Sequence, residues 1–222
     1  MRSTFYWLIK GLAWPLVRLL FRFTREHGDL VPASGACIVV ANHTSYLDAI
    51  ILGSACPRRL RFMINAEIYR LLRLRWFYYM MGSIPLRAER GDTGALRTAL
   101  HTLKQGVGVG IFPEGQRMHD GTVGEGKVGV AFIAARSGAP VIPAAIIGAH
   151  RAMPVGASLP RLFPIRVVFG EPIRFVARGR KAGREELDAF ADRVMQAITE
   201  LGAPTAAEQR EAGADVAGER RA

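Results

Sequence analysis

ACIVVANHTSYLD, residues 36–48, is the stretch on which the expected architecture of this chain depends. It begins with a short apolar run, residues 36–41, whose β-branched content predicts a strand buried on both faces. The cap and turn residues that follow, and an apolar pattern at helical spacing from Leu47 onward, predict a helix. His43 therefore lies where a buried strand gives way to a helix. That is the carboxyl edge of a sheet, where open α/β folds bind ligands.

Asp48 lies five residues after His43, at a position expected to be about one and a half turns into the helix. From there a carboxylate can reach back to one imidazole nitrogen, which fixes the tautomer and leaves the other nitrogen free to accept a proton. The alternative interpretation is a structural histidine next to ordinary helix-capping residues. A second stretch favours a functional site over that alternative.

This second stretch is an apolar strand predicted over Val107–Phe112, which ends in Pro113-Glu114-Gly115-Gln116-Arg117. Two strands that each end in a titratable cluster indicate one shared site at one edge of one sheet. Glu114 and Arg117 are three residues apart, so they would share a face in a helical turn. A local ion pair that stabilises the loop is the alternative.

Four blocks of the chain resemble the 1-acylglycerol-3-phosphate acyltransferase family, one of the glycerolipid acyltransferases. They occur in the family's order between residues 36 and 147, which is more specific than any single motif. The resemblance implies acyl transfer from acyl-CoA or acyl carrier protein to the free hydroxyl of a lysophospholipid. The blocks are the His-x4-Asp motif at Asn42–Asp48, the intermediate block at Gly82–Arg87, the Glu-Gly-x-Arg block at Phe112–Arg117 and the last block at Val141–Pro143.

The resemblance also implies roles for individual residues. His43 would be the general base and Asp48 the acid that orients it, as in the serine protease triad. Glu114 and Gly115 would shape the phosphate pocket, with Arg117 as the direct contact. No cofactor and no metal are implied, and the default acceptor is 1-acylglycerol-3-phosphate, giving phosphatidic acid.

Two positions depart from the family pattern. The arginine expected six residues after Gly82 is Ala88, so the phosphate-binding role passes to Arg87, with Arg90 in reserve. The alternative is that both arginines are surface charges. Met118 stands where most relatives have serine, which removes one hydroxyl donor. These departures leave room for another acceptor, such as a lyso-ornithine lipid.

The charge of the chain favours an anionic partner. Its 222 residues carry a formal net charge of +11, with a sequence pI near 10.6. We expect an anionic membrane surface and a phosphorylated substrate rather than nucleic acid, because zinc-ligand spacing and known nucleic-acid motifs are absent and the basic residues alternate with bulky aliphatics. Cys37 and Cys56 lie in apolar settings and are interpreted as buried hydrophobic residues.

The N-terminal residues 5–25 are rich in aromatic and aliphatic side chains but contain four cations, so their uncharged runs are too short to span a bilayer. At 100° per residue the cations share about a third of the helical circle, with Gly11 and Pro15 on the same side. This predicts a helix lying in the membrane interface, kinked or split at Pro15, on the cytoplasmic face of the inner membrane. A helix packed on the domain with its charges in water is the alternative. Deleting residues 1–25 should release the protein from the membrane.

The expected fold class is α/β, a mixed sheet flanked by helices, with an N-terminal amphipathic helical membrane-binding appendage. The expected organisation is an interfacial segment 1–28, an acyltransferase domain 29–202 and a disordered tail 203–222. Pro143 argues for an edge or a bulge in its strand. Further strands are predicted over 61–64, 82–86, 140–147 and 166–169, and helices over 66–81, 95–105, 130–136 and 184–201.

Two other classes of function remain open from the sequence. A hydrolase using His43 and Asp48 with water or serine is disfavoured, because the chain has no Gly-x-Ser-x-Gly elbow. A non-catalytic basic membrane-binding module is the other. Thiol release from acyl-CoA separates the three classes, because only the transferase requires the lysophospholipid.

Overall fold

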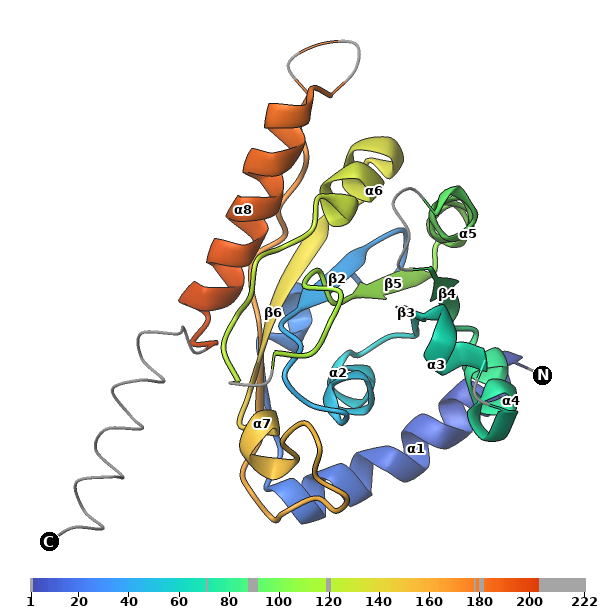
Figure 1. Cartoon of the computed structure of the whole chain (residues 1–222), viewed down its shortest axis with the longest axis vertical. Coiled ribbons are helices and arrows are strands. Elements are labelled where there is room, and N and C mark those ends of the chain that lie inside the picture. The colour runs from blue at the N-terminus through green and yellow to red at the C-terminus, as the bar shows by residue number, and fades with distance from the viewer. Residues whose placement is uncertain are drawn as a thin grey trace, which may run out of the picture.

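The computed structural model describes residues 2–70, 72–87, 92–118, 121–177, 179 and 182–203. Its centre is a seven-stranded sheet with strand order β1-β7-β6-β2-β5-β3-β4 (Figure 1). The strands are β1 (Thr24–Glu26), β2 (Ile38–Ala41), β3 (Leu60–Asn65), β4 (Ile84–Leu86), β5 (Gly108–Ile111), β6 (Val141–Ile147) and β7 (Arg166–Phe169).

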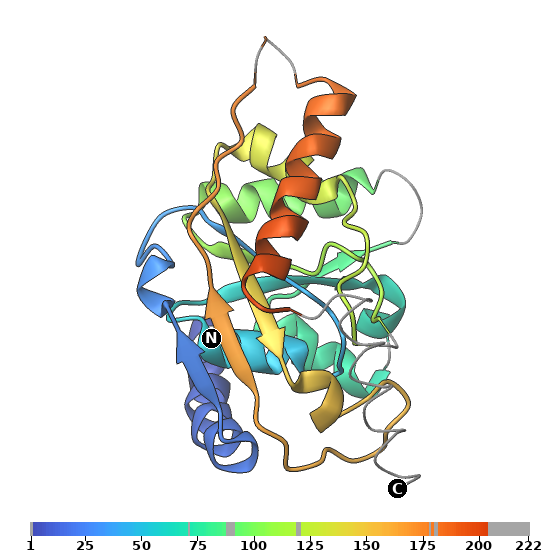
Figure 2. The same ribbon diagram turned by 90° about the vertical axis from the view of Figure 1, so that its left-hand side faces the viewer.

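Helices connect these strands and cover both faces of the sheet (Figures 1 and 2). One face is packed against α5, α6 and α8, and the other against α1, α2 and α7. The helices are α1 (Arg2–Phe21), the 3-10 turn η1 (Gly28–Leu30), α2 (Asp48–Ala55), α3 (Ala66–Arg70), α4 (Leu72–Met81), α5 (Thr93–Lys104), α6 (Gly129–Ser137), α7 (Ala149–Ala152) and α8 (Arg184–Glu200).

The sheet is mixed, as predicted. β6 and β7 pair antiparallel, whereas β2 pairs in parallel with both β5 and β6. All four residues of β2 are buried, and their side chains alternate between the two cores, with Val40 in one and Val39 in the other. A strand covered by helices on both faces has no polar side, which explains its continuous apolar run.

Pro143 lies in an interior strand, so of the two expected alternatives, an edge or a bulge, the edge is wrong. β6 is flanked by β2 and β7, and Pro143 is paired with Val40 of β2. On the other side the β7 ladder ends where Ala144 pairs with Phe169, and pairing resumes at a single bridge between Val141 and Ile173, so one extra residue opposes β6 here and the expected bulge is present. A proline has no backbone N–H to donate, and at this interruption of the ladder with β7 no donor is required from position 143.

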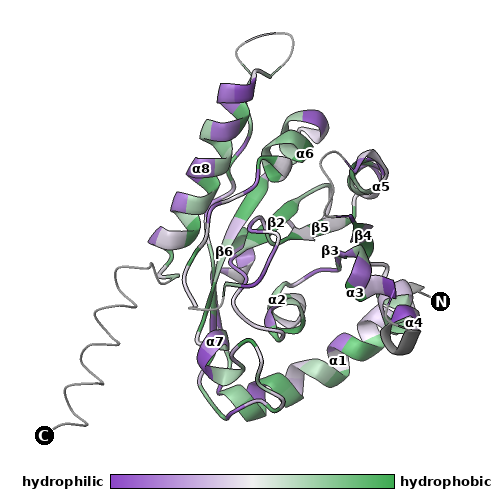
Figure 3. Cartoon of the chain, viewed as in Figure 1, coloured by the Kyte–Doolittle hydropathy of each residue, from purple (hydrophilic) through white to green (hydrophobic). Residues whose placement is uncertain are grey.

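The N-terminal helix is present and runs through Pro15 without a break. Tyr6, Val17 and Phe21 are buried, so one side of α1 belongs to the core. The opposite side exposes a row of leucines, and Figure 3 shows green, hydrophobic segments that recur along α1 between paler and purple ones. The large exposed side chains of α1 are Trp7, Leu8, Leu12, Leu16 and Leu19.

The expected boundary at residue 28 does not separate two bodies. β1 pairs with β7 in the sheet, and Phe23 is part of the core beside α1. Removing residues 1–25 would therefore remove part of the sheet as well as α1. The predicted tail begins at Ala203, the last described residue, and the rest of it lies outside the described residues. No helix in the described ranges combines the length and the apolarity that a bilayer crossing requires.

Candidate active site

The two predicted clusters meet at one edge of the sheet. β2 and β5 are parallel neighbours in which Val40 is opposite Ile111. The loop that carries His43 follows β2, and the turn that carries Glu114 follows β5, so both leave the sheet at the same end. The shared site expected from the sequence is therefore formed.

His43 and Asp48 are hydrogen-bonded, with 2.8 Å between Nδ1 and Oδ2. The imidazole side chain is 17% exposed, whereas the carboxylate is fully buried. A carboxylate only accepts hydrogen bonds, so Nδ1 is assigned the proton. That tautomer leaves the lone pair of Nε2 available to accept another proton.

Asp48 is the first residue of α2, not one and a half turns into it. Its Oδ2 also accepts the backbone N–H groups of Thr44 at 2.7 Å and Ser45 at 2.8 Å. The carboxylate thus organises the whole loop in front of the helix. None of the capping residues expected there serves as the N-cap, because Leu47 occupies that position without a side-chain hydrogen bond.

The imidazole of His43 is held in its plane by stacking. It lies on the ring of Phe112 with 4.3 Å between centroids and 17° between planes. Phe112 in turn stacks on Phe62 at 6.0 Å. Aromatic packing on one side and Asp48 at one ring edge leave little rotational freedom, so Nε2 has a defined direction.

Glu114 connects its own turn to the backbone of His43. Its Oε2 accepts the N–H of His43 at 2.8 Å, and its Oε1 accepts the N–H of Gly124 at 3.1 Å. The N–H of Met118 donates to the carbonyl of His43 at 2.8 Å. The carboxylate is nearly buried, so these bonds rigidly join the two loops.

Arg117 points elsewhere, because residues 113–118 form a turn rather than the expected helical one. Its guanidinium carbon lies 4.1 Å from the centroid of the Tyr46 ring. Its Nε is buried and has no hydrogen-bond partner in the described structure. Burial raises the pKa of Tyr78, and the nearby positive charge of Arg117 acts against that rise. Arg117 thus places a cation against Tyr46, near enough for its charge to act on Tyr78, at the same sheet edge as His43.

Gly115 adopts a φ of +71°, which L side chains rarely adopt. A Cβ on it would lie 2.5 Å from Nζ of Lys127, so the ammonium covers this turn. The backbone N–H of Lys127 donates to the carbonyl of Pro113 at 2.9 Å. Lys127 was not predicted as a site residue, since it is twelve positions from Gly115 and no local pattern connects them. The N–H of Gly115 donates to the carbonyl of Phe112 at 3.2 Å, and this hydrogen bond closes the turn.

Arg87 follows β4 and lies at the same sheet edge, but it is not brought into contact with the other site residues. In the order β5-β3-β4, its strand is two positions from β5, or about 10 Å. Its side chain is exposed, and its N–H donates to Asp92 at 2.8 Å. Ala88 and Arg90 lie outside the described residues.

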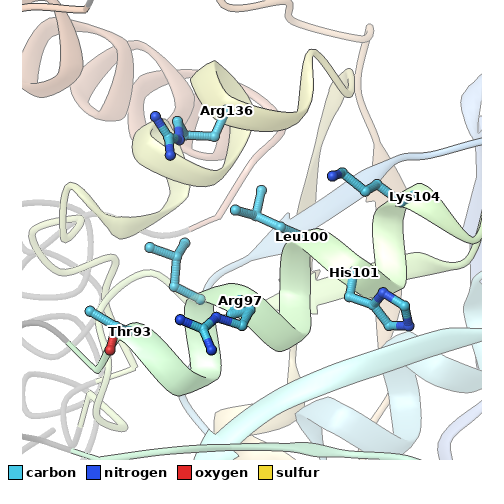
Figure 4. A pocket seen from close by; sticks show the side chains of 7 residues that line it. Thr93, Arg97, Leu100, His101, Lys104 and Arg136 are labelled. Carbon is cyan, nitrogen blue, oxygen red and sulfur yellow. The ribbon is translucent and has the colours of Figure 1, made fainter.

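A separate hollow of about 360 Å³ lies between α5 and α6 (Figure 4). None of the predicted site residues lines it, so it is not the candidate active site. Within the described ranges, no group of three metal-ligating side chains comes together. The hollow is lined by Thr93, Leu96, Arg97, Leu100, His101, Lys104 and Arg136.

The fold and this site correspond to a known class of protein. The family model described as Acyltransferase matches residues 22–147, more than half of the chain. The chain belongs to this acyltransferase family.

Individual relatives are more specific in their names. The chain is 34% identical over 148 residues to the chloroplastic 1-acyl-sn-glycerol-3-phosphate acyltransferase BAT2 of Brassica napus, covering 65% of this chain and 43% of that protein. It is 27% identical over 172 residues to the 1-acyl-sn-glycerol-3-phosphate acyltransferase of Bacillus subtilis, covering 77% of this chain and 83% of that protein. The chain thus spans less than half of the plant relative but most of the bacterial one.

A solved structure supports the same relationship. The crystal structure of the 1-acyl-sn-glycerophosphate (LPA) acyltransferase PlsC from Thermotoga maritima matches with a TM-score of 0.74 and 27% identity. The match covers 91% of this chain and 82% of that one, so nearly all of the described fold is shared.

Proposed function

We propose that this protein transfers an acyl group from a thioester, acyl-CoA or acyl carrier protein, to the free hydroxyl of 1-acylglycerol-3-phosphate, giving phosphatidic acid. The observation that carries the proposal is the hydrogen bond of 2.8 Å between His43 and Asp48 at the carboxyl edge of the sheet. The names of the relatives, which refer to this acceptor, support it further.

The chemistry requires activation of a poor nucleophile. Nε2 of His43 takes the hydroxyl proton as the acceptor oxygen attacks the thioester carbonyl, a contribution on the order of 10²–10⁴ in rate. The tetrahedral intermediate then expels the thiolate, which recovers the proton, so an ester and a free thiol are the products. Asp48 holds the tautomer and offsets the charge of the imidazolium. The substrate supplies the nucleophile, so no acyl-enzyme is needed.

The acceptor's phosphate would bind at Arg117. Its guanidinium carries a positive charge against the Tyr46 ring and has a buried Nε whose partner is missing among the described residues. A guanidinium binds a phosphate dianion through two parallel hydrogen bonds, and an unused donor makes this favourable. Arg87 is proposed as a second, more distant cation for the same group.

An anionic membrane surface is proposed as the partner that presents the acceptor. The exposed leucines of α1 lie beside Arg18 and Arg22, which are also exposed. An apolar strip next to cations is the composition of a helix that lies in the headgroup region. We place the protein peripherally on the cytoplasmic face of the inner membrane, where the thioester donors are available.

The test uses the purified protein with acyl-CoA or acyl carrier protein loaded with the same acyl chain, and a panel of lyso-lipids. Thiol release that requires lysophosphatidic acid and falls to a residual level in His43→Ala supports the proposal, and the faster thioester identifies the donor. Release that requires a phosphate-free acceptor, such as a lyso-ornithine lipid, would reassign the acceptor. Release without any acceptor would indicate a hydrolase, and no release a non-catalytic membrane-binding module.

A further inference from the structure

The loop between α7 and β7, residues 153–165, holds two leucines out into solvent. Leu159 is 79% exposed and Leu162 is 77% exposed. The loop backbone is nevertheless tied down, since the N–H of Arg161 donates to the carbonyl of Ala152 at 2.6 Å. Two leucine side chains held in water by an ordered backbone are thermodynamically unfavourable. Their exposure indicates that another apolar phase covers them.

This 153–165 loop lies on the same side of the molecule as the outer face of α1. Its last residue, Ile165, donates its N–H to the carbonyl of Phe21, the last residue of α1, at 2.9 Å. Two residues earlier in that helix, Leu19 is exposed. In both views the loop runs beside the C-terminal end of α1 at the bottom of the molecule (Figures 1 and 2). The apolar row of α1 is therefore continued by the loop.

The charge around the two leucines identifies the covering phase. Residues 151–165 contain two arginines and no acidic residue. Arg161 lies between the leucines in sequence, and Arg151 is stacked over the ring of Phe163 at 5.4 Å. Leucines that enter the acyl region while arginines remain at the phosphates match an anionic bilayer.

We propose that the 153–165 loop contacts the bilayer in addition to α1 and lies next to the active site. This proposal rests on the membrane association proposed above. The carbonyl of Met153, where the loop begins, accepts the hydroxyl of Ser45 at 2.8 Å. Ser45 belongs to the loop that Asp48 organises. The bilayer would thus be brought to the edge of the site, and a lyso-lipid would reach His43 without leaving the interface.

The test compares the full chain with its Leu159→Ser/Leu162→Ser double variant in sedimentation with vesicles of phosphatidylcholine and phosphatidylglycerol. Losing two inserted leucines should weaken partitioning roughly ten- to a hundredfold. Val176→Ser is the matched control, because Val176 is 81% exposed but lies on the segment between β7 and α8, which rises to the opposite end in Figure 2. Thermal unfolding of all three proteins should coincide, since the substituted side chains are exposed.

A second measurement separates membrane contact from damage to the site. Acyl transfer to an acceptor embedded in the vesicles should fall with partitioning, whereas transfer to a water-soluble short-chain acceptor should stay within about twofold of wild type. Partitioning equal to that of wild type, or an equal loss in Val176→Ser, would overturn the proposal. If a Leu12→Ser/Leu16→Ser variant of α1 loses partitioning while the loop variant does not, only the loop is refuted. If no variant and not even the wild type binds vesicles, the membrane association itself is refuted.

Discussion

Replacing Asp48 with asparagine tests the proposed mechanism at its most constrained atom. Oδ2 of Asp48 accepts from the imidazole of His43 and from the N–H groups of Thr44 and Ser45. Asparagine keeps the size of the side chain and an oxygen for these donors, but it removes the charge that offsets the imidazolium. We expect kcat to fall by roughly 10²–10⁴, the usual contribution of general acid–base catalysis. The same change at the acid of the serine protease triad lowers kcat by about 10⁴, at the upper end of this range.

Alanine at the same position would be a poorer test. Asp48→Ala leaves two buried N–H groups without an acceptor and removes a charge-assisted bond to His43. Losses of this kind cost roughly 3–5 kcal/mol of stability, a large part of the stability of an average domain. A drop in activity would then report unfolding as much as chemistry.

A double-mutant cycle makes the prediction sharp. If Asp48 acts only through the imidazole, Asp48→Asn should slow the wild type but change nothing further in His43→Ala. The coupling between the two sites would then be about 3–5 kcal/mol, the full effect of 10²–10⁴ at 1.36 kcal/mol per decade. The assay is thiol release dependent on lysophosphatidic acid, with thermal unfolding as the control. The same fractional loss in both backgrounds, or an Asp48→Asn protein with wild-type kcat, would refute the reasoning.

Three further substitutions test individual contacts. Arg117→Lys keeps the charge but not the planar group over Tyr46, so it should raise KM for the lyso-lipid about tenfold with little change in kcat; a loss confined to kcat would contradict phosphate binding. Gly115→Ala should lower the free energy of unfolding by about 1 kcal/mol or more, because φ is +71° and the new Cβ would meet Lys127; an unchanged denaturant midpoint would contradict this. Asp92→Ala should cost about 1 kcal/mol at neutral pH, because Asp92 is the N-cap of α5. Hydrogen bonds from the backbone N–H groups of Arg87 and Ala95 lower the pKa of Asp92 from its ordinary value of 3.8. The stabilisation that Asp92 provides is therefore complete above pH 3.8, and it is lost as the pH falls through the lowered pKa of the folded state. The gap between wild type and variant should therefore narrow in acid, as measured by urea unfolding at several pH values, and a gap independent of pH would be the contrary result.

The features that were predictable from the sequence are those determined by near neighbours. The apolar run of β2 requires helices on both faces, and the structure has them. The bond between His43 and Asp48 joins residues only five apart, so a turn and a helix start were sufficient to anticipate it. The exact start of α2 was missed, because Asp48 itself accepts the loop's N–H groups and leaves no role for a conventional cap.

The other features that were missed depend on contacts distant in sequence. Lys10 is one of the four cations that the helical pattern groups on the basic side of the N-terminal helix, but its ammonium donates to the carbonyl of Cys56. That partner is 46 residues away, and helical periodicity carries no information about it. The cation over Gly115 and the tyrosine under Arg117 likewise come from other loops. The bulge that accommodates Pro143 also involves another strand, so the sequence could not choose between a bulge and an edge position.

The contact of Lys10 connects the two proposed functions of the molecule. The last carbonyls of any helix lack partners within it, and those at the end of α2 accept from Lys10 and, at 3.3 Å, from Arg25. Asp48 is at the other end of that helix. α1 thus exposes leucines on its outer side and, through Lys10 on its inner side, binds the C-terminal end of α2, the helix that begins at Asp48. A deletion of residues 1–25 would remove both contacts, so it cannot separate membrane binding from catalysis. Substitutions of the exposed leucines can separate the two, because they leave the hydrogen bonds of Lys10 and Arg25 to α2 intact.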